Sequence, residues 1–127
     1  MKKIIILVLF LTVTAIAIIG CSGGDKETAV ILEDGAAEAA GASELNLVAT
    51  NWQFDQQEYV VKEGEPIKLS LNNAEGMHRV NIRGIGIDLA EGETVTFKPL
   101  KAGTYTIICS FPCGTGHSKM NAKLIVQ

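Results

Sequence analysis

Apolar and polar residues alternate along most of the chain after Ser43, and this two-residue period is typical of half-buried β-strands. The alternating or β-rich segments are residues 45–49, 58–62, 67–72, 79–83, 94–98, 105–109 and 124–126. Glycine-containing turns separate several of them, and no convincing amphipathic helix occurs among them. About seven short strands with turns between them predict an all-β sandwich or barrel.

Residues 1–20 have a different pattern. Two lysines precede an almost unbroken apolar run over residues 4–19, and small uncharged residues follow from Gly20 onward. A basic start, a short apolar core and a small-residue flank are the features of a secretory signal peptide. We therefore predict a signal peptide over residues 1–20, with an N-terminal transmembrane anchor as the alternative.

The end of this segment, Ile18-Ile19-Gly20-Cys21, resembles a bacterial lipobox. Gly20 and Cys21 fit that pattern, whereas Ile18 and Ile19 depart from its preferred leucine and small residue. The resemblance implies a lipid on Cys21 and cleavage before it. Since two or more acyl chains anchor a protein lastingly, we expect the rest of the chain at the outer face of a bacterial cell membrane.

Residues 21–43 show no usable period, because acidic residues mix with alanine and glycine. Such a segment buries too little apolar surface to offset the entropy of ordering it. We predict a flexible tether over residues 21–43, with a short alanine-rich helical turn as the alternative. Residues 44–127 then form the folded domain, whose core is thin enough to gain from a bound metal.

The formal net charge of −3 bears on the kind of partner. Nucleic-acid-binding domains usually carry a basic patch, so this charge argues against a nucleic-acid partner.

Four potential metal ligands lie close together near the C-terminus. Cys109, Cys113, His117 and Met120 follow the spacing Cys-x3-Cys-x3-His-x2-Met at the end of a predicted strand. Thiolate and thioether ligands favour copper, and imidazole binds both of its oxidation states. Gly114 and Gly116 allow the backbone to turn tightly enough for one loop to surround a metal.

A fifth ligand comes from another part of the chain. By strand alternation His78 shares a face with Val80 and Ile82, so we expect its side chain to point inward. Met77 then points to the opposite face. With His117, His78 accounts for both histidines of the chain.

The segment from Cys109 to Met120 resembles the loop of the CuA domain, the dinuclear copper module of haem–copper oxidase subunit II and nitrous-oxide reductase. This resemblance implies a cupredoxin-like Greek-key β-sandwich over residues 44–127 that binds two copper ions. It implies six ligands: His78, Cys109, the backbone carbonyl of Phe111, Cys113, His117 and Met120. The two cysteines bridge the coppers, each histidine binds one copper, and the methionine and the carbonyl complete the set.

Two bridging thiolates spread one electron over both metals, so neither metal rearranges much during transfer. No coordination position is left open for a substrate. The resemblance therefore implies an electron relay between cytochrome c, or another redox donor, and a terminal oxidase or reductase. We expect no catalysis from this chain alone, and cytochrome c oxidase activity only as part of a larger complex.

The sequence also departs from the family. Many oxidase subunits carry a glutamate that helps to bind magnesium where this chain has Phe111, which leaves only its carbonyl. Together with the lipobox, this favours a tethered single-domain relay over an ordinary proton-pumping oxidase subunit. Residues 51–54 resemble a tryptophan-containing segment of subunit II, where an aromatic residue lies on the electron-entry side, but we expect Trp52 in the core or at the edge of the sandwich rather than as a relay.

Three other chemistries remain open for the cysteine pair. Cys109 and Cys113 could form a disulfide in an oxidising compartment. They could bind zinc with the two histidines, or one cysteine could hold a single copper. For the function, the alternative to electron transfer is a copper carrier or assembly protein that hands copper over.

Overall fold

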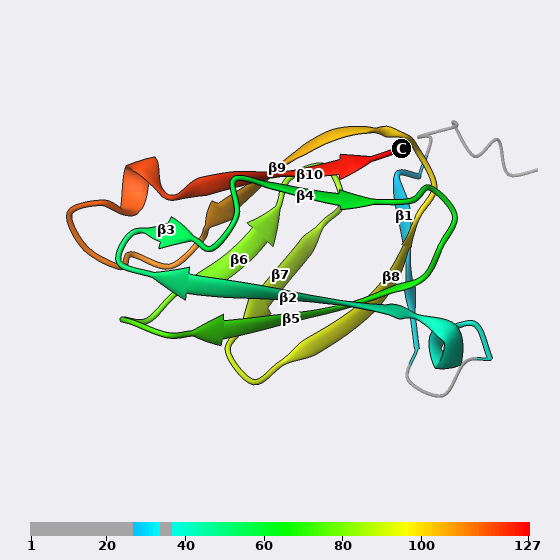
Figure 1. Ribbon diagram of the computed structural model, residues 1–127, viewed down its shortest axis with the longest axis horizontal. Coiled ribbons are helices and arrows are strands. Elements are labelled where there is room, and N and C mark those ends of the chain that lie inside the picture. The colour runs from blue at the N-terminus through cyan, green and yellow to red at the C-terminus, as the bar shows by residue number, and fades with distance from the viewer. Residues whose placement is uncertain (1–26, 34–36) are drawn as a thin grey trace, which may run out of the picture.

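The alternating segments form strands in the computed structural model, which describes residues 27–33 and 37–127 (Figure 1). Within these residues the strands are β1 (Ala29–Leu32), β2 (Ser43–Thr50), β3 (Gln53–Phe54), β4 (Glu58–Val61), β5 (Ile67–Asn73), β6 (Arg79–Ile82), β7 (Ile87–Ala90), β8 (Thr94–Pro99), β9 (Gly103–Cys109) and β10 (Asn121–Val126). Two 3-10 turns, η1 (Ala39–Gly41) and η2 (His117–Lys119), complete the described elements.

The strands form two sheets of five strands each. One sheet has the order β1-β8-β5-β2-β3 and the other has the order β4-β10-β9-β6-β7. Most neighbours are antiparallel, but β2 pairs with β5 and β4 pairs with β10 in parallel. The predicted all-β sandwich is confirmed.

The core lies between the sheets and is built from the inward-facing positions of the alternating segments. In β5, Leu69 is fully buried and the adjacent Lys68 is exposed. Phe97 in the same sheet and Ile107 and Leu124 in the other sheet are also completely buried. The two-residue period of the sequence therefore corresponds to a sandwich in which one face of each sheet is removed from water.

Three strands were not predicted from the sequence. β3 has only two residues, which is too short for a period. In β7, Ile87 and Leu89 are buried on either side of the exposed Asp88, but two apolar positions are too few to distinguish a strand from a turn. The third is β1.

β1 differs from the predicted flexible tether over residues 21–43. Ala29 and Leu32 pair with Pro99 and Thr96 at the edge of the first sheet. β1 is paired with β8 through its backbone and is only partly buried, since Ile31 is 50% exposed while Ala29 packs against the core. A segment without an apolar period can therefore still be ordered by an available sheet edge.

The predicted signal peptide and Cys21 lie outside the described residues. Within the described residues, no helix has the length and apolar character needed to cross a bilayer.

The central position of β9 determines where the predicted metal ligands meet. β9 pairs with β6 on one side, with Val80 opposite Cys109, and with β10 on the other side, with Asn121 opposite Ile108. The connection from β9 to β10, which contains η2, lies at one end of the sandwich, and the C-terminus lies at the other (Figure 1).

Leu69→Ala should lower the free energy of unfolding of the metal-free protein by about 3 kcal/mol, because it removes a fully buried side chain and leaves a cavity. The matched control is Lys68→Ala, one residue away on the exposed face, which should change it by less than about 0.5 kcal/mol. Urea unfolding measures both values. Equal effects at the two positions would contradict the assigned faces of β5.

Candidate metal centre

The loop between β9 and β10 is fixed at both ends by the sheet. The backbone N–H of Cys109, the last residue of β9, donates to the carbonyl of Met120 at 3.3 Å. The N–H of Ser110 donates to the carbonyl of Arg79 in β6 at 2.9 Å. Residues 110–120 therefore leave and rejoin the sandwich at adjacent points.

Hydrogen bonds within the loop turn His117 back toward the cysteines. The N–H of His117 donates to Gly114 O at 3.1 Å, and the N–H of Met120 donates to His117 O at 3.2 Å. These bonds close the η2 turn, whose first residue is His117. A short turn of this kind brings a side chain back over the residues that precede it.

The sulfur atoms of Cys109 and Cys113 lie 3.5 Å apart, and both cysteines are free. A disulfide bond would require about 2.05 Å, so the disulfide alternative is not formed here. Metal–thiolate bonds of about 2.3 Å would allow one ion to contact both sulfurs at this separation. Cys109 is buried and Cys113 is partly buried.

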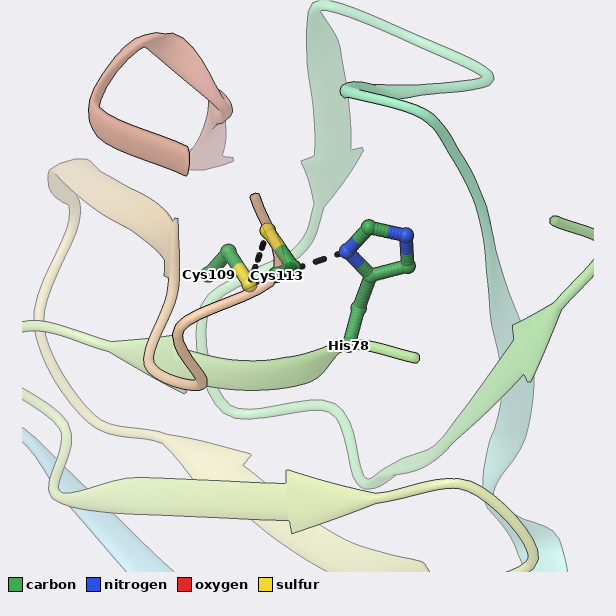
Figure 2. A group of neighbouring side chains, drawn as sticks. All are labelled: His78, Cys109 and Cys113. Atoms are coloured by element: carbon green, nitrogen blue, oxygen red, sulfur yellow. Dashed lines mark hydrogen bonds between the residues drawn. The ribbon is translucent and has the colours of Figure 1, made fainter. Parts of the chain in front are cut away.

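Each histidine faces a different sulfur. His78 Nδ1 lies 3.8 Å from Cys109 Sγ, and His117 Nδ1 lies 3.6 Å from Cys113 Sγ. The ligand atoms of His78, Cys109 and Cys113 all lie within 4.8 Å of one another. Figure 2 shows the ring of His78, which directly precedes β6, directed at the sulfur atoms of Cys109 and Cys113.

The ring of His78 is held in the orientation that a metal ligand needs. Its Nε2 lies 2.9 Å from the carbonyl oxygen of Glu75. Because a carbonyl only accepts hydrogen bonds, Nε2 carries the hydrogen, which leaves the lone pair of Nδ1 facing Cys109. The side chain is 1% exposed, and this confirms the predicted inward orientation, whereas Met77 is 64% exposed.

The two other predicted ligands also lie at this site. The carbonyl oxygen of Phe111 lies 3.2 Å from Cys109 Sγ and accepts a hydrogen bond from the thiol. Met120 is 2% exposed, and with Cys109 and His117 it lines a hollow of about 260 Å³. The structure therefore brings both histidines and the Phe111 carbonyl within 3.8 Å of one of the two sulfurs, and it places Met120 in the same hollow as Cys109.

The electrostatics of the metal-free site favour the neutral form of the Cys113 thiol. Burial, with the hydrogen bond between the two cysteine sulfurs as the second cause, raises the pKa of the Cys113 thiol to about 11. Since thiolate is the form that binds metals, an incoming ion must displace the proton of Cys113. Two sulfurs, two imidazoles, a thioether and a carbonyl form a donor set that suits a soft metal such as copper.

Sequence reasoning missed two contacts to the ligands. One is the Glu75 carbonyl on His78, although Gly76, with φ of 76°, marks a tight turn just before the histidine. The other is Trp52, whose Nε1–H donates to the carbonyl of Cys113 at 2.9 Å. Both acceptors are backbone carbonyls, which a pattern of side chains does not reveal.

Two sequence comparisons agree with the predicted resemblance. A family model described as the Cupredoxin-like domain matches residues 4–126. The alternative cytochrome c oxidase subunit 2 of Bradyrhizobium diazoefficiens is 29% identical over 68 residues, which cover 50% of this chain and 24% of that protein. The chain therefore spans about a quarter of the length of this curated relative.

Two solved structures share the fold. The periplasmic domain of subunit II of cytochrome oxidase of Bradyrhizobium japonicum is 20% identical, with a TM-score of 0.58 over 66% of this chain and 83% of that chain. Dithionite-reduced auracyanin from Roseiflexus castenholzii is 21% identical, with a TM-score of 0.54 over 68% and 99%. Together with the family model and the curated relative, these structures confirm the predicted resemblance to oxidase subunit II and to cupredoxins.

The raised pKa of Cys113 predicts slow alkylation of this thiol in the metal-free, folded protein. Because only thiolate reacts, the rate with iodoacetamide should rise about tenfold per pH unit above neutral pH and level off near pH 11. Mass spectrometry of the peptide that carries Cys113 measures the rate. The same protein in denaturant is the control, and its rate should level off near the ordinary thiol pKa of 9.0. Identical profiles in the two states would contradict the assigned environment.

Proposed function

We propose that this chain, which belongs to the cupredoxin-like domain family, is an electron-transfer protein with a dinuclear copper site of the CuA type. The observation that carries the proposal is the pair of free sulfurs 3.5 Å apart, with a histidine Nδ1 facing each sulfur. His78, Cys109, the Phe111 carbonyl, Cys113, His117 and Met120 would hold the two ions.

The number of donors supports two ions rather than one. A structural zinc ion uses four ligands in a tetrahedron, and a mononuclear blue-copper site uses one cysteine. This site offers six donors, including two cysteines whose sulfurs lie 3.5 Å apart. The thioether of Met120 and the carbonyl of Phe111 would be surplus at a zinc site, whereas two copper ions would use the whole set.

The chain's own residues supply the rigidity that electron transfer requires. The bound copper pair would supply an electron shared between two metals. Backbone hydrogen bonds of Cys109 and Ser110 tie the ligand loop to the sheet, and the Glu75 carbonyl holds the ring of His78. Ligands that move little lower the energy needed to rearrange the site on each transfer.

The proposed setting is the outer face of a bacterial cell membrane, with a lipid on Cys21 as the tether. The proposed partners are cytochrome c or another redox donor and a terminal oxidase or reductase. Similarity to an oxidase subunit 2 supports this choice of partners. The chain alone would catalyse no reaction, and oxidase activity would require the larger complex.

One observation favours a second function, that of a copper carrier or assembly protein. The hollow of about 260 Å³ beside the ligands is lined by Cys109, His117 and Met120, so one side of the ligand set opens to a surface cavity. Such an opening would let a partner's ligands approach and remove copper. The carrier would bind one Cu(I) that exchanges readily, whereas the relay would hold two coppers tightly.

Cys113→Ser should abolish binding of the second copper, because it removes one of the two sulfurs that the ions share. After reduction and copper addition, the unaltered protein should retain two coppers per chain and show intense thiolate-to-copper absorption in the visible region. Elemental analysis and the absorption spectrum of both proteins test this expectation. Two retained coppers in Cys113→Ser would remove Cys113 from the site.

Cys21→Ser is the matched control, since it makes the same substitution at the remaining cysteine. It should retain two coppers and the visible spectrum, while mass spectrometry should no longer find a lipid at position 21. A single Cu(I) in the unaltered protein, lost at once to a chelator, would support the carrier and contradict the relay. Zinc without visible absorption would contradict both.

A further inference from the structure

Trp52 touches the ligand loop through its polar and its apolar atoms. Its Nε1–H donates to the Cys113 carbonyl at 2.9 Å. The indole is 38% exposed, so its position does not follow from burial in the core. A partly exposed tryptophan with a satisfied N–H is typical of a residue that covers a polar surface.

The glycines of the loop are fitted to this side chain. A Cβ on Gly114 would lie 3.0 Å from Nε1 and 3.1 Å from Cζ2 of Trp52. A Cβ on Gly116 would overlap Cβ and Cγ of Trp52. The indole therefore packs against the bare backbone between Cys113 and His117, where any larger residue would displace it.

The residues just before Trp52 contact Glu75, whose carbonyl orients the ring of His78. The N–H of Asn51 faces the Glu75 carboxylate at 3.4 Å, and the N–H of Glu75 donates to the carbonyl of Ala49 at 3.3 Å. The Glu75 carbonyl is the group that orients His78. Figure 1 shows the turn between β2 and β3 at the same end of the sandwich as the ligand loop.

We propose that residues 49–52 form a clasp that positions both halves of the metal site, with Trp52 as the positioning residue for Cys113. One short segment holds the Cys113–His117 loop through the indole and the His78 ring through Glu75. Its effect on copper rests on the proposed function, whereas its effect on the loop is a property of the protein without metal.

The indole N–H also has an electrostatic role. The partly positive hydrogen of this N–H points at the carbonyl of Cys113, the residue whose sulfur would bind both ions. A positive dipole beside the site stabilises the reduced, more electron-rich state, so it raises the reduction potential. A group that only filled space would leave the potential unchanged.

The test replaces Trp52, the one tryptophan of the chain, with 3-benzothienylalanine. This analogue keeps the shape of the indole and puts sulfur in place of N–H, so it removes the hydrogen bond without opening a cavity. In the metal-free protein, amide hydrogen exchange of His117, Lys119 and Met120 should become about tenfold faster. In the copper-loaded protein, release to a Cu(I) chelator should become about tenfold faster, and the midpoint potential should fall.

Gly116→Ala attacks the same contact from the loop side and should speed exchange and copper release in the same direction. Gly41→Ala is its control, because a Cβ there meets nothing within 4 Å. Tyr105→Phe is the control for the tryptophan analogue. It also removes one hydrogen bond from an aromatic side chain to a backbone carbonyl, that of Lys101, but away from the site. Neither control should change exchange in the loop.

Unchanged exchange and unchanged copper release in both altered proteins would overturn the clasp. Faster release with an unchanged potential would overturn its electrostatic role and leave the positioning role supported. If the unaltered protein binds no copper pair, the proposed function fails, while exchange in the metal-free protein still decides whether Trp52 holds the loop.

Discussion

The pairing of β9 with both β6 and β10 is the constraint on which the site depends. Cys109 ends β9, His78 immediately precedes β6, and Met120 immediately precedes β10. Because β9 lies between these two strands, ligands far apart in the sequence leave the sheet at one point. The remaining donors belong to the loop that joins β9 to β10, so the same pairing determines where that loop starts and ends.

In this arrangement a metal ion and a proton compete for the sulfur of Cys113. Without metal, a hydrogen bond joins the sulfurs and burial raises the pKa of Cys113. A bound ion would replace the thiol proton and the weak hydrogen bond between the sulfurs with metal–sulfur bonds. Because the ion binds the folded chain, it would stabilise the folded state. The sheet holds the donors close together in advance, which lowers the entropy lost when the ion binds.

Side-chain pattern predicted the parts of the structure that burial determines. The sequence pattern identified seven strands. It also predicted that His78 points inward, because His78 continues the apolar face of β6, and this position is buried in the structure. The ligand loop was predictable because Cys109 directly precedes it and three further donor side chains, those of Cys113, His117 and Met120, occur within it. Contacts made by backbone could not be predicted: β1 depends on an open edge of β8, the orientation of His78 depends on the Glu75 carbonyl, and Trp52 binds the carbonyl of Cys113.

Electron paramagnetic resonance of the copper-loaded protein in its half-oxidised state tests most directly whether Cys109 and Cys113 jointly bridge two coppers. If both sulfurs are shared, one unpaired electron couples equally to two copper nuclei, and the hyperfine pattern shows this coupling. We expect that pattern. A spectrum in which the electron couples to a single copper nucleus would contradict it.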